Sequence, residues 1–121
     1  MSEKTIIQYE TAFAKCKDVF TKKTKDYGTS WRILRARSIT DQIYIKAKRI
    51  RTIDETGENK VGDSIESEFI GCVNYGIIAI IQLNLQNKKD VAIELDETEA
   101  IALYDEQYNI IKNLFIAKNH D

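Results

Sequence analysis

The sequence predicts an all-α fold in the form of a four-helix, bundle-like domain. Proline is absent from the 121 residues and glycine occurs only five times, so few positions interrupt helical structure. Apolar residues recur at helical spacing in four segments, and the connectors between these segments are short. Four helices with short connections are typical of a bundle, and a chain of this length is long enough to bury a core.

The first helix is expected over residues 5–25. Its apolar side chains recur every three or four positions, at Ile6, Tyr9, Phe13, Cys16 and Phe20. Gly28 then supplies a residue that readily adopts the left-handed conformation with which many helices end. Residues 29–37 follow as a connector, in which we expect a short helical turn.

The second and third helices are each expected to begin at a capping box, in which a side chain at the helix start binds a backbone amide three residues on. Ser38-x-x-Asp41 opens the second helix, which Gly57 ends, and Asp63-x-x-Glu66 opens the third. The third helix runs to about residue 86 and is apolar on nearly all sides, which places it at the centre of the domain. A buried strand over residues 76–85 is the weaker alternative.

The fourth helix begins at another capping box, Asp96-x-x-Glu99, and repeats the first helix. Residues 104–121 align without a gap on residues 9–26, which lie 95 positions earlier, and identical pairs include Tyr9/Tyr104, Lys17/Lys112, Phe20/Phe115, Lys23/Lys118 and Asp26/Asp121. We therefore expect one domain over residues 1–95. Residues 96–121 are expected to pack on it as the start of a truncated or decayed second copy. Repeated helices of this kind also favour association between chains, so we expect a homo-oligomer.

Charge and composition narrow the range of functions. The net charge is −1, yet residues 22–51 carry ten Lys/Arg and only two Asp. A basic block of this kind favours a phosphate-rich ligand, with a pair of solvated helix faces as the alternative. The remainder of the chain is acidic, which argues against nucleic acid as the partner. His120 is the only histidine and lies beside the chain end, which argues against histidine-based catalysis and zinc chemistry.

Membrane and redox features are weak in this sequence. No apolar run approaches membrane-spanning length and the N-terminus lacks a signal-peptide pattern, so we expect a cytoplasmic protein without a membrane partner. Cys16 and Cys72 are far apart and lie in apolar helical patterns. We expect both to be buried free thiols.

The first of three candidate site segments surrounds the glycine turn. Lys23, Asp26, Tyr27 and Trp31 bring together a cation, an acid and two aromatic rings. Lysine can bind phosphate there, and an aromatic ring can stack on a base. The alternative is a helix C-terminus where the dipole favours lysine, followed by a buried tryptophan that anchors the loop.

The other two segments supply further charges. Lys46 and Arg49 share a helix face near Asp41 and can offer two cations to a polyphosphate, although a solvated basic stripe would look the same. Asp63 and Glu66, three residues apart, can share a Mg²⁺ ion, although a capping box explains the same spacing. Asn74 lies in an otherwise apolar helix, where a buried amide needs hydrogen-bond partners.

Together the three segments resemble the nucleotide-modification-associated domain 1 family, formerly a domain of unknown function. The resemblance covers about residues 9–85 and is carried by three blocks in order: Lys23-x-x-Asp26-Tyr27-Gly28, Asp41-x-x-x-x-Lys46-x-x-Arg49-Ile50, and Glu66 through Asn74-Tyr75. The family in turn looks like the all-α MazG-type nucleotide pyrophosphohydrolases. Those enzymes hold Mg²⁺ on acidic residues of facing helices and cleave nucleoside triphosphates.

The resemblance implies a nucleotide-binding protein, with Mg²⁺-dependent pyrophosphohydrolysis of (deoxy)nucleoside triphosphates as its candidate activity. Asp63 and Glu66 are the candidate catalytic residues and, with Asp41, the candidate Mg²⁺ ligands. The candidate substrate-binding residues are Lys23, Asp26, Tyr27, Trp31, Lys46, Arg49 and Asn74. The alternative function is a non-catalytic helical module for interaction or dimerisation, in which the acids cap helices and the bases lie on the surface.

Overall fold

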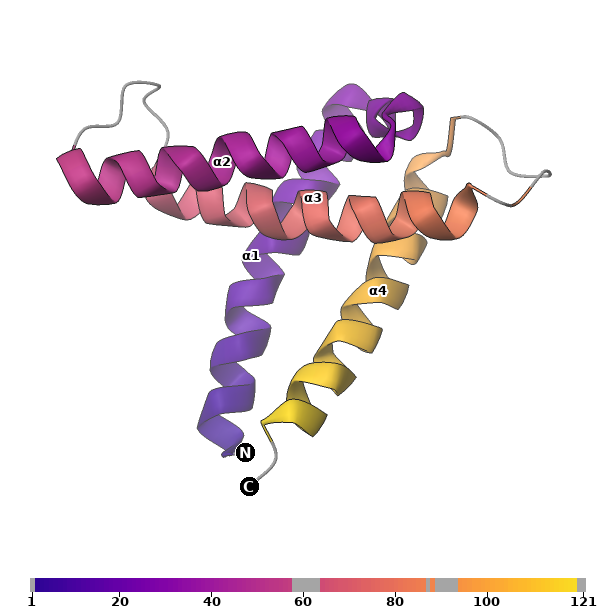
Figure 1. The fold of residues 1–121 in the computed structure, drawn as a ribbon. Helices are drawn as coiled ribbons and strands as arrows, with labels where there is room; N and C mark the ends of the chain where they lie inside the picture. The colour runs from indigo at the N-terminus through magenta and orange to yellow at the C-terminus, as the bar shows by residue number, and fades with distance from the viewer. Residues whose placement is uncertain (1, 58–63, 87, 89–93, 120–121) are drawn as a thin grey trace.

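A computed structural model describes residues 2–57, 64–86, 88 and 94–119 of the chain, and it contains four long helices and one short 3-10 helix (Figure 1). The elements are α1 (Glu3–Tyr27), η1 (Ser30–Ile33), α2 (Ala36–Thr56), α3 (Ile65–Leu85) and α4 (Glu97–Lys118). The predicted all-α class is confirmed. The strand alternative over residues 76–85 is wrong, because this stretch belongs to α3.

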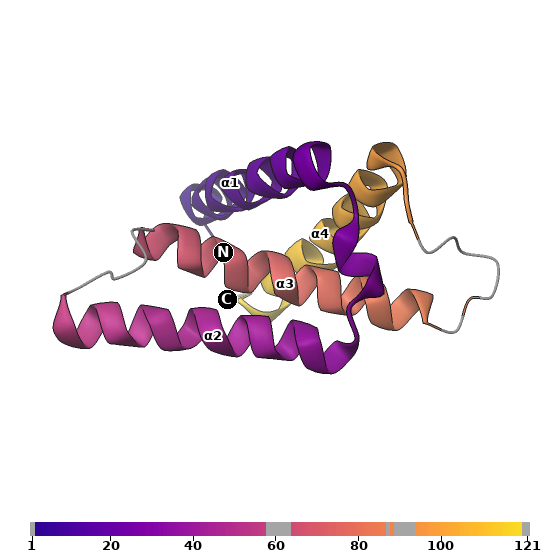
Figure 2. The same ribbon diagram turned by 90° about the horizontal axis from the view of Figure 1, so that it is seen from above.

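The helices pack as two antiparallel pairs that cross. Figures 1 and 2 show α2 and α3 side by side, with α1 and α4 forming a second pair that crosses α3 at a steep angle. The start of α1 and the end of α4 lie close together at the far end of this second pair. Only α3 contacts all three other helices extensively, and its contact with α2 is the largest. The apolar third helix is therefore the central element, as its sequence predicts.

Three of the predicted helix termini agree closely with the structure. Gly28 and Gly57 end α1 and α2 with φ of 69° and 72°, which are left-handed values that glycine adopts without steric cost. Asp96 caps α4 through its Oδ1, which accepts a hydrogen bond from the Glu99 amide at 2.7 Å. The short helical turn expected in the connector is η1.

The other two predicted capping boxes are wrong. α2 begins at Ala36, so Ser38 lies inside the helix rather than at its start. α3 is capped by Ser64, whose Oγ accepts a hydrogen bond from the Ser67 amide at 3.1 Å. Serine is among the best N-cap residues, so the sequence offers Ser64 and Asp63 as two adjacent candidates for the same cap. Asp63 itself lies outside the described residues.

The core lies where the two helix pairs meet. Apolar side chains of α3 form its centre, and residues from the other elements close around them: Phe13, Cys16, Phe20, Trp31, Ile39, Ile77, Ile78, Ile81, Leu85, Leu95, Ala100 and Tyr104. Burying a large apolar side chain of this kind contributes about 1.5–3 kcal/mol. Cys16 is a buried free thiol as predicted, whereas the free thiol of Cys72 is only half-buried.

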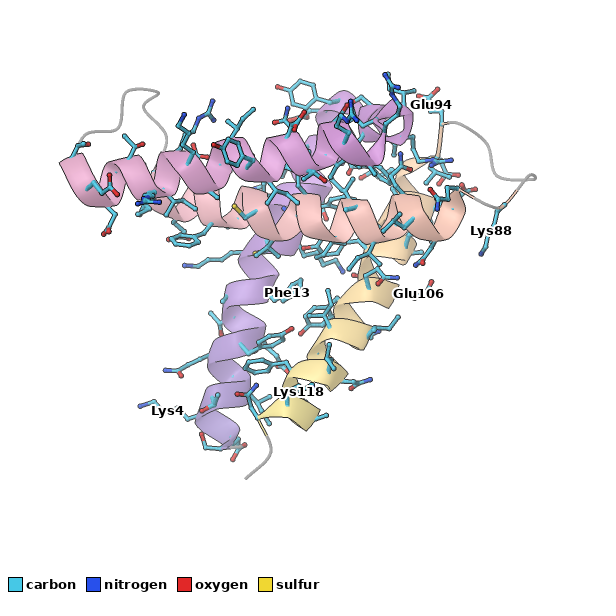
Figure 3. All side chains as sticks on the ribbon, viewed as in Figure 1. Lys4, Phe13, Lys88, Glu94, Glu106 and Lys118 are labelled. Atoms are coloured by element: carbon cyan, nitrogen blue, oxygen red, sulfur yellow. The ribbon has the colours of Figure 1, made fainter. Side chains whose placement is uncertain are left out.

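Aromatic contacts between α1 and α4 occur in matched pairs. The ring of Tyr9 stacks on Phe115 with centroids 4.3 Å apart, and the equivalent pair, Tyr104 with Phe20, stacks at 4.4 Å. Phe13 projects from α1 toward α4, as Figure 3 shows, and its ring meets Tyr108 at 4.6 Å. Phe13 and Tyr108 are themselves 95 positions apart, so this contact lies at the centre of the pattern.

Ion pairs between α1 and α4 also occur as a matched pair. Lys17 Nζ lies 2.8 Å from Asp105 Oδ1, and the equivalent residues Lys112 and Glu10 also pair. In these contacts each helix contributes the same kind of residue to one contact and its counterpart to the other. An interface with this exchange has approximate two-fold symmetry. Within one chain, α4 thus packs on α1 as a second copy of that helix would.

By length and composition alone, α3 is long and apolar enough to cross a membrane, so the expectation that no apolar run approaches membrane-spanning length is wrong. A third of that stretch is buried inside the domain, and the core helix of a soluble protein satisfies the same criterion.

Candidate functional site

A cavity of about 660 Å³ lies between the C-terminal half of α1, η1, α2 and α3. This volume is within the range of small-molecule sites. The residues that line it are Val19, Phe20, Lys23, Thr24, Tyr27, Gly28, Ser30, Trp31, Ile33, Leu34, Lys46, Ser67, Glu68, Ile70, Gly71, Asn74, Tyr75 and Ile78. Along α3 the lining extends from Ser67 to Ile78, which corresponds to about 16 Å of helix.

Aromatic and aliphatic side chains form most of the cavity wall. Trp31 is buried and packs on Phe20 with ring centroids 6.4 Å apart. Its backbone is fixed by Gln82 of α3, whose Nε2 lies within hydrogen-bond distance of three carbonyl oxygens of the η1 segment, those of Trp31, Arg32 and Leu34, at 2.8–3.1 Å. One amide therefore anchors the aromatic side of the cavity to the central helix.

A charged cluster around the buried Glu68 lines the cavity where α2 faces α3. The side chain of Glu68 is 1% exposed, and its carboxylate lies 3.9 Å from Lys46 Nζ and 3.6 Å from Arg49 Nη1. The two cations compensate the charge of the carboxylate, but both distances are too long for hydrogen bonds. No described residue donates a hydrogen bond to either carboxylate oxygen. Native proteins seldom leave such atoms unpaired, because an unsatisfied buried acceptor is costly.

Gly71 creates the space in which Lys46 lies. A Cβ built on Gly71 would come within 2.6 Å of Lys46 Cε and closer still to Cδ, so any side chain there would displace the lysine. Lys46 Nζ then lies 5.8 Å from the centroid of the Tyr75 ring. Gly71 therefore permits close packing of α3 against α2, and it sets the position of a cation at the cavity wall.

Asn74 lies in the cavity wall but has both ends of its amide engaged. Its Nδ2 donates to the Cys16 carbonyl at 3.0 Å, and its Oδ1 accepts from the Tyr104 hydroxyl at 2.8 Å. Burial raises the pKa of the Tyr104 phenol well above its usual value. The amide thus joins α1, α3 and α4, and we assign it a structural role.

The structure brings together most of the predicted substrate-binding residues. Lys23, Tyr27, Trp31 and Lys46 line the cavity together with Asn74. Arg49 and Asp26 are not among the lining residues. Arg49 lies behind the lining residue Glu68, with its Nη1 3.6 Å from Glu68 Oε1, and Asp26 is exposed.

The predicted Mg²⁺ ligands do not assemble in the described part of the chain. Asp41 is exposed on α2, and the exposed Glu66 pairs with Lys15 of α1 at 3.4 Å. Among the described residues, no group of three or more His, Cys, Asp or Glu side chains is placed to hold a metal ion. Asp63, the remaining candidate, lies outside those residues. The described residues therefore do not by themselves fit a Mg²⁺ centre.

Sequence reasoning missed the cavity contributions of Glu68, Gly71 and Tyr75. These three residues recur on one face of α3 at spacings of three and four, which was the available signal. That spacing identifies a shared face, but only the register of α3 against α2 shows that Lys46 lies across it.

Comparison with known proteins assigns the chain to a family. Residues 23–83 match the sequence pattern of the family described as nucleotide modification associated domain 1. The chain belongs to this family. Searches among curated proteins and among solved structures returned no match. The resemblance expected from the sequence is confirmed at the level of the nucleotide modification associated domain, whereas the distant similarity to MazG-type enzymes stays a prediction.

The matched segment coincides with the cavity. It contains every lining residue except Val19 and Phe20, and it includes the whole cluster of Lys46, Arg49 and Glu68. α4 and most of α1 lie outside the segment. The nucleotide modification associated domain thus supplies η1, α2 and α3, and the α1·α4 pair closes the remaining side of the core.

Proposed function

We propose that the protein binds a nucleotide in this cavity. The observation that carries the proposal is a pair of buried polar groups in the wall that lack partners among the described residues. Trp31 Nε1 is a donor without an acceptor, and the Glu68 carboxylate is an acceptor without a donor. A nucleotide carries donors and acceptors on its base, ribose and phosphate, so different parts of one ligand would satisfy the two groups while the base stacks on the aromatic wall.

Lys23 supplies a suitable contact for phosphate. It lines the cavity from the end of α1, and it forms no ion pair with any described residue. A mobile ammonium with three donors is a common partner for a phosphate group. The description of the family, nucleotide modification, agrees with a ligand that carries both a base and a phosphate.

The proposal is limited to binding. Pyrophosphohydrolysis of the MazG type requires bound Mg²⁺, and the described acids do not form a centre for it. The binding titrations are therefore repeated with Mg²⁺ and with detection of nucleoside monophosphate and pyrophosphate, so that turnover is measured independently of binding.

The single tryptophan provides the test. Trp31 is the only tryptophan and lies in the cavity wall, so its fluorescence reports on occupancy. Titration with nucleoside monophosphates and triphosphates should change this fluorescence saturably, with matching heats in calorimetry. Lys23→Ala should weaken binding about tenfold, which is about 1.4 kcal/mol. The matched control is Lys22→Ala, because Lys22 pairs with Asp18 and lies outside the cavity. Absence of any fluorescence change or heat with all nucleotides would refute the proposal.

One observation favours a second candidate function, association through α3. Five large apolar side chains on its outer face are substantially exposed: Ile65, Phe69, Val73, Ile80 and Leu83. They recur at spacings of three, four and seven, so they form one stripe along the helix. Exposed apolar surface of this extent is typical of interaction sites. Light scattering after size-exclusion chromatography would detect a dimer that Leu83→Lys dissociates; a monomeric wild-type protein would exclude self-association.

A further inference from the structure

The Glu68 carboxylate has a specific hydrogen-bonding requirement. An ionised carboxylate only accepts hydrogen bonds, and it presents two oxygens side by side. Lys46 and Arg49 lie 3.9 and 3.6 Å away, so they compensate its charge without donating to it. Both oxygens are buried and unpartnered within the described part of the chain. What the site lacks is therefore a pair of adjacent donors.

We infer that Glu68 selects guanine, an inference that rests on the proposed binding of a nucleotide in this cavity. Guanine presents two adjacent N–H groups, N1–H and the N2 amino group, that match the two oxygens of a carboxylate. Adenine and cytosine each place their amino group beside a ring nitrogen that is an acceptor, which repels one carboxylate oxygen. Thymine and uracil place their single N–H between two carbonyl groups. Guanine is therefore the common base whose edge fits Glu68.

Lys46 completes the recognition of the same edge. The O6 acceptor of guanine lies beside N1–H, and Lys46 Nζ lies beside Glu68 Oε2. A base held by the carboxylate would thus place O6 next to the ammonium. The Tyr75 ring, 5.8 Å from Lys46 Nζ, offers an aromatic face in the same wall. In this arrangement Lys46 contacts the base, and Lys23 remains the phosphate contact.

The wild-type protein tests this inference with a panel of monophosphates. Trp31 fluorescence and calorimetry should show GMP binding roughly 5- to 150-fold more tightly than AMP, CMP or UMP, the range for one bidentate base contact. IMP is the sharpest comparison, because it differs from GMP only in lacking the N2 amino group, and it should bind several-fold more weakly. Equal affinities for GMP and IMP would overturn the inference.

Substitution of the acid gives an independent test. Glu68→Gln replaces one acceptor with a donor, so it should abolish the preference for GMP over AMP while Lys23 still holds the phosphate. The matched control is Glu66→Gln, because Glu66 is exposed, pairs with Lys15 and lies outside the cavity wall. Its base preference should equal that of the wild type. A Glu68→Gln protein that keeps the full preference would contradict the inference.

The outcomes separate this inference from the proposed function. If nucleotides bind with no base preference, guanine selection fails and nucleotide binding stands. If no nucleotide binds, the proposed function itself fails. A melting curve identifies a Glu68→Gln protein that does not fold, and in that case the comparison of GMP with IMP on the wild type decides alone.

Discussion

Replacing Gly71 with alanine should reveal how strongly the fold depends on the position of Lys46. Alanine favours a helix interior over glycine by about 1 kcal/mol, so the substitution would stabilise an unobstructed helix by that amount. Gly76, also in α3, offers the matched control because a Cβ there would meet nothing within 4 Å. Gly76→Ala should therefore stabilise the protein by about 1 kcal/mol.

At Gly71 the same gain is opposed by displacement of the lysine. The added Cβ would lie 2.6 Å from Lys46 Cε, so the side chain must leave its place beside Glu68. Glu68 is 1% exposed and would then keep only the Arg49 guanidinium close by. Removing one partner of a buried ion pair costs about 3–5 kcal/mol. Because Arg49 stays beside the carboxylate, we expect a smaller loss here, and Gly71→Ala should have a net destabilising effect of about 0.5–2 kcal/mol.

Urea denaturation of the two variants beside the wild type measures this difference. Gly76→Ala should shift the midpoint to higher urea and Gly71→Ala to lower urea, with unchanged slopes. Gly71→Ala should also weaken nucleotide binding, whereas Gly76→Ala should leave it unchanged. If both variants stabilise the protein equally, the placement of Lys46 contributes nothing to stability and the reasoning is refuted.

Three further predictions concern the scaffold. Asn74→Leu removes the partner of the buried Tyr104 hydroxyl and should cost about 2–4 kcal/mol in chemical denaturation, whereas the exposed Asn84→Leu should cost less than about 0.5 kcal/mol. Burial raises the folded-state pKa of Tyr104, so the contribution of this phenol to stability is present below pH 10 and is lost as the pH rises above 10. Tyr104→Phe should flatten this loss of stability in melting curves taken from pH 9 to pH 11. Lys17→Glu should cost about 0.5 kcal/mol and be rescued by Asp105→Lys, because the two residues pair across α1 and α4; no rescue would mean that this pair contributes nothing.

Local sequence patterns predicted the helices well and their starting residues less well. Apolar periodicity located all four helices, because burial of one face decides where a helix forms. The sequence pattern predicts that α2 starts at Ser38, whereas the helix already begins at Ala36 and Ile39 is fully buried. At α3 two adjacent residues could each cap, and spacing alone selected Asp63 over Ser64. Tertiary packing decides at which residue a helix begins, and the spacing of residues in the sequence carries no information about that packing.

The residues of the candidate site likewise fall into those that local sequence patterns predict and those that only tertiary packing reveals. Trp31, Lys23 and Lys46 could be proposed from residue type and local spacing, and the structure places all three at one cavity. Glu68 could not be distinguished from its neighbour Glu66, because both lie in the first turn of α3. One turns into the domain against Lys46 and the other outward to Lys15. Only the packing of three helices gives these two acids different environments.

The most direct test of nucleotide binding in the cavity is a set of intermolecular NOEs between bound GMP and isoleucine methyl groups. Ile70 and Ile78 line the cavity, and Ile80 lies on the exposed face of the same helix. The base and ribose protons of GMP should show NOEs to the methyl groups of Ile70 and Ile78 and none to Ile80. NOEs to Ile80 alone, or none to the cavity methyl groups at saturating GMP, would contradict the assignment of this cavity as the nucleotide site.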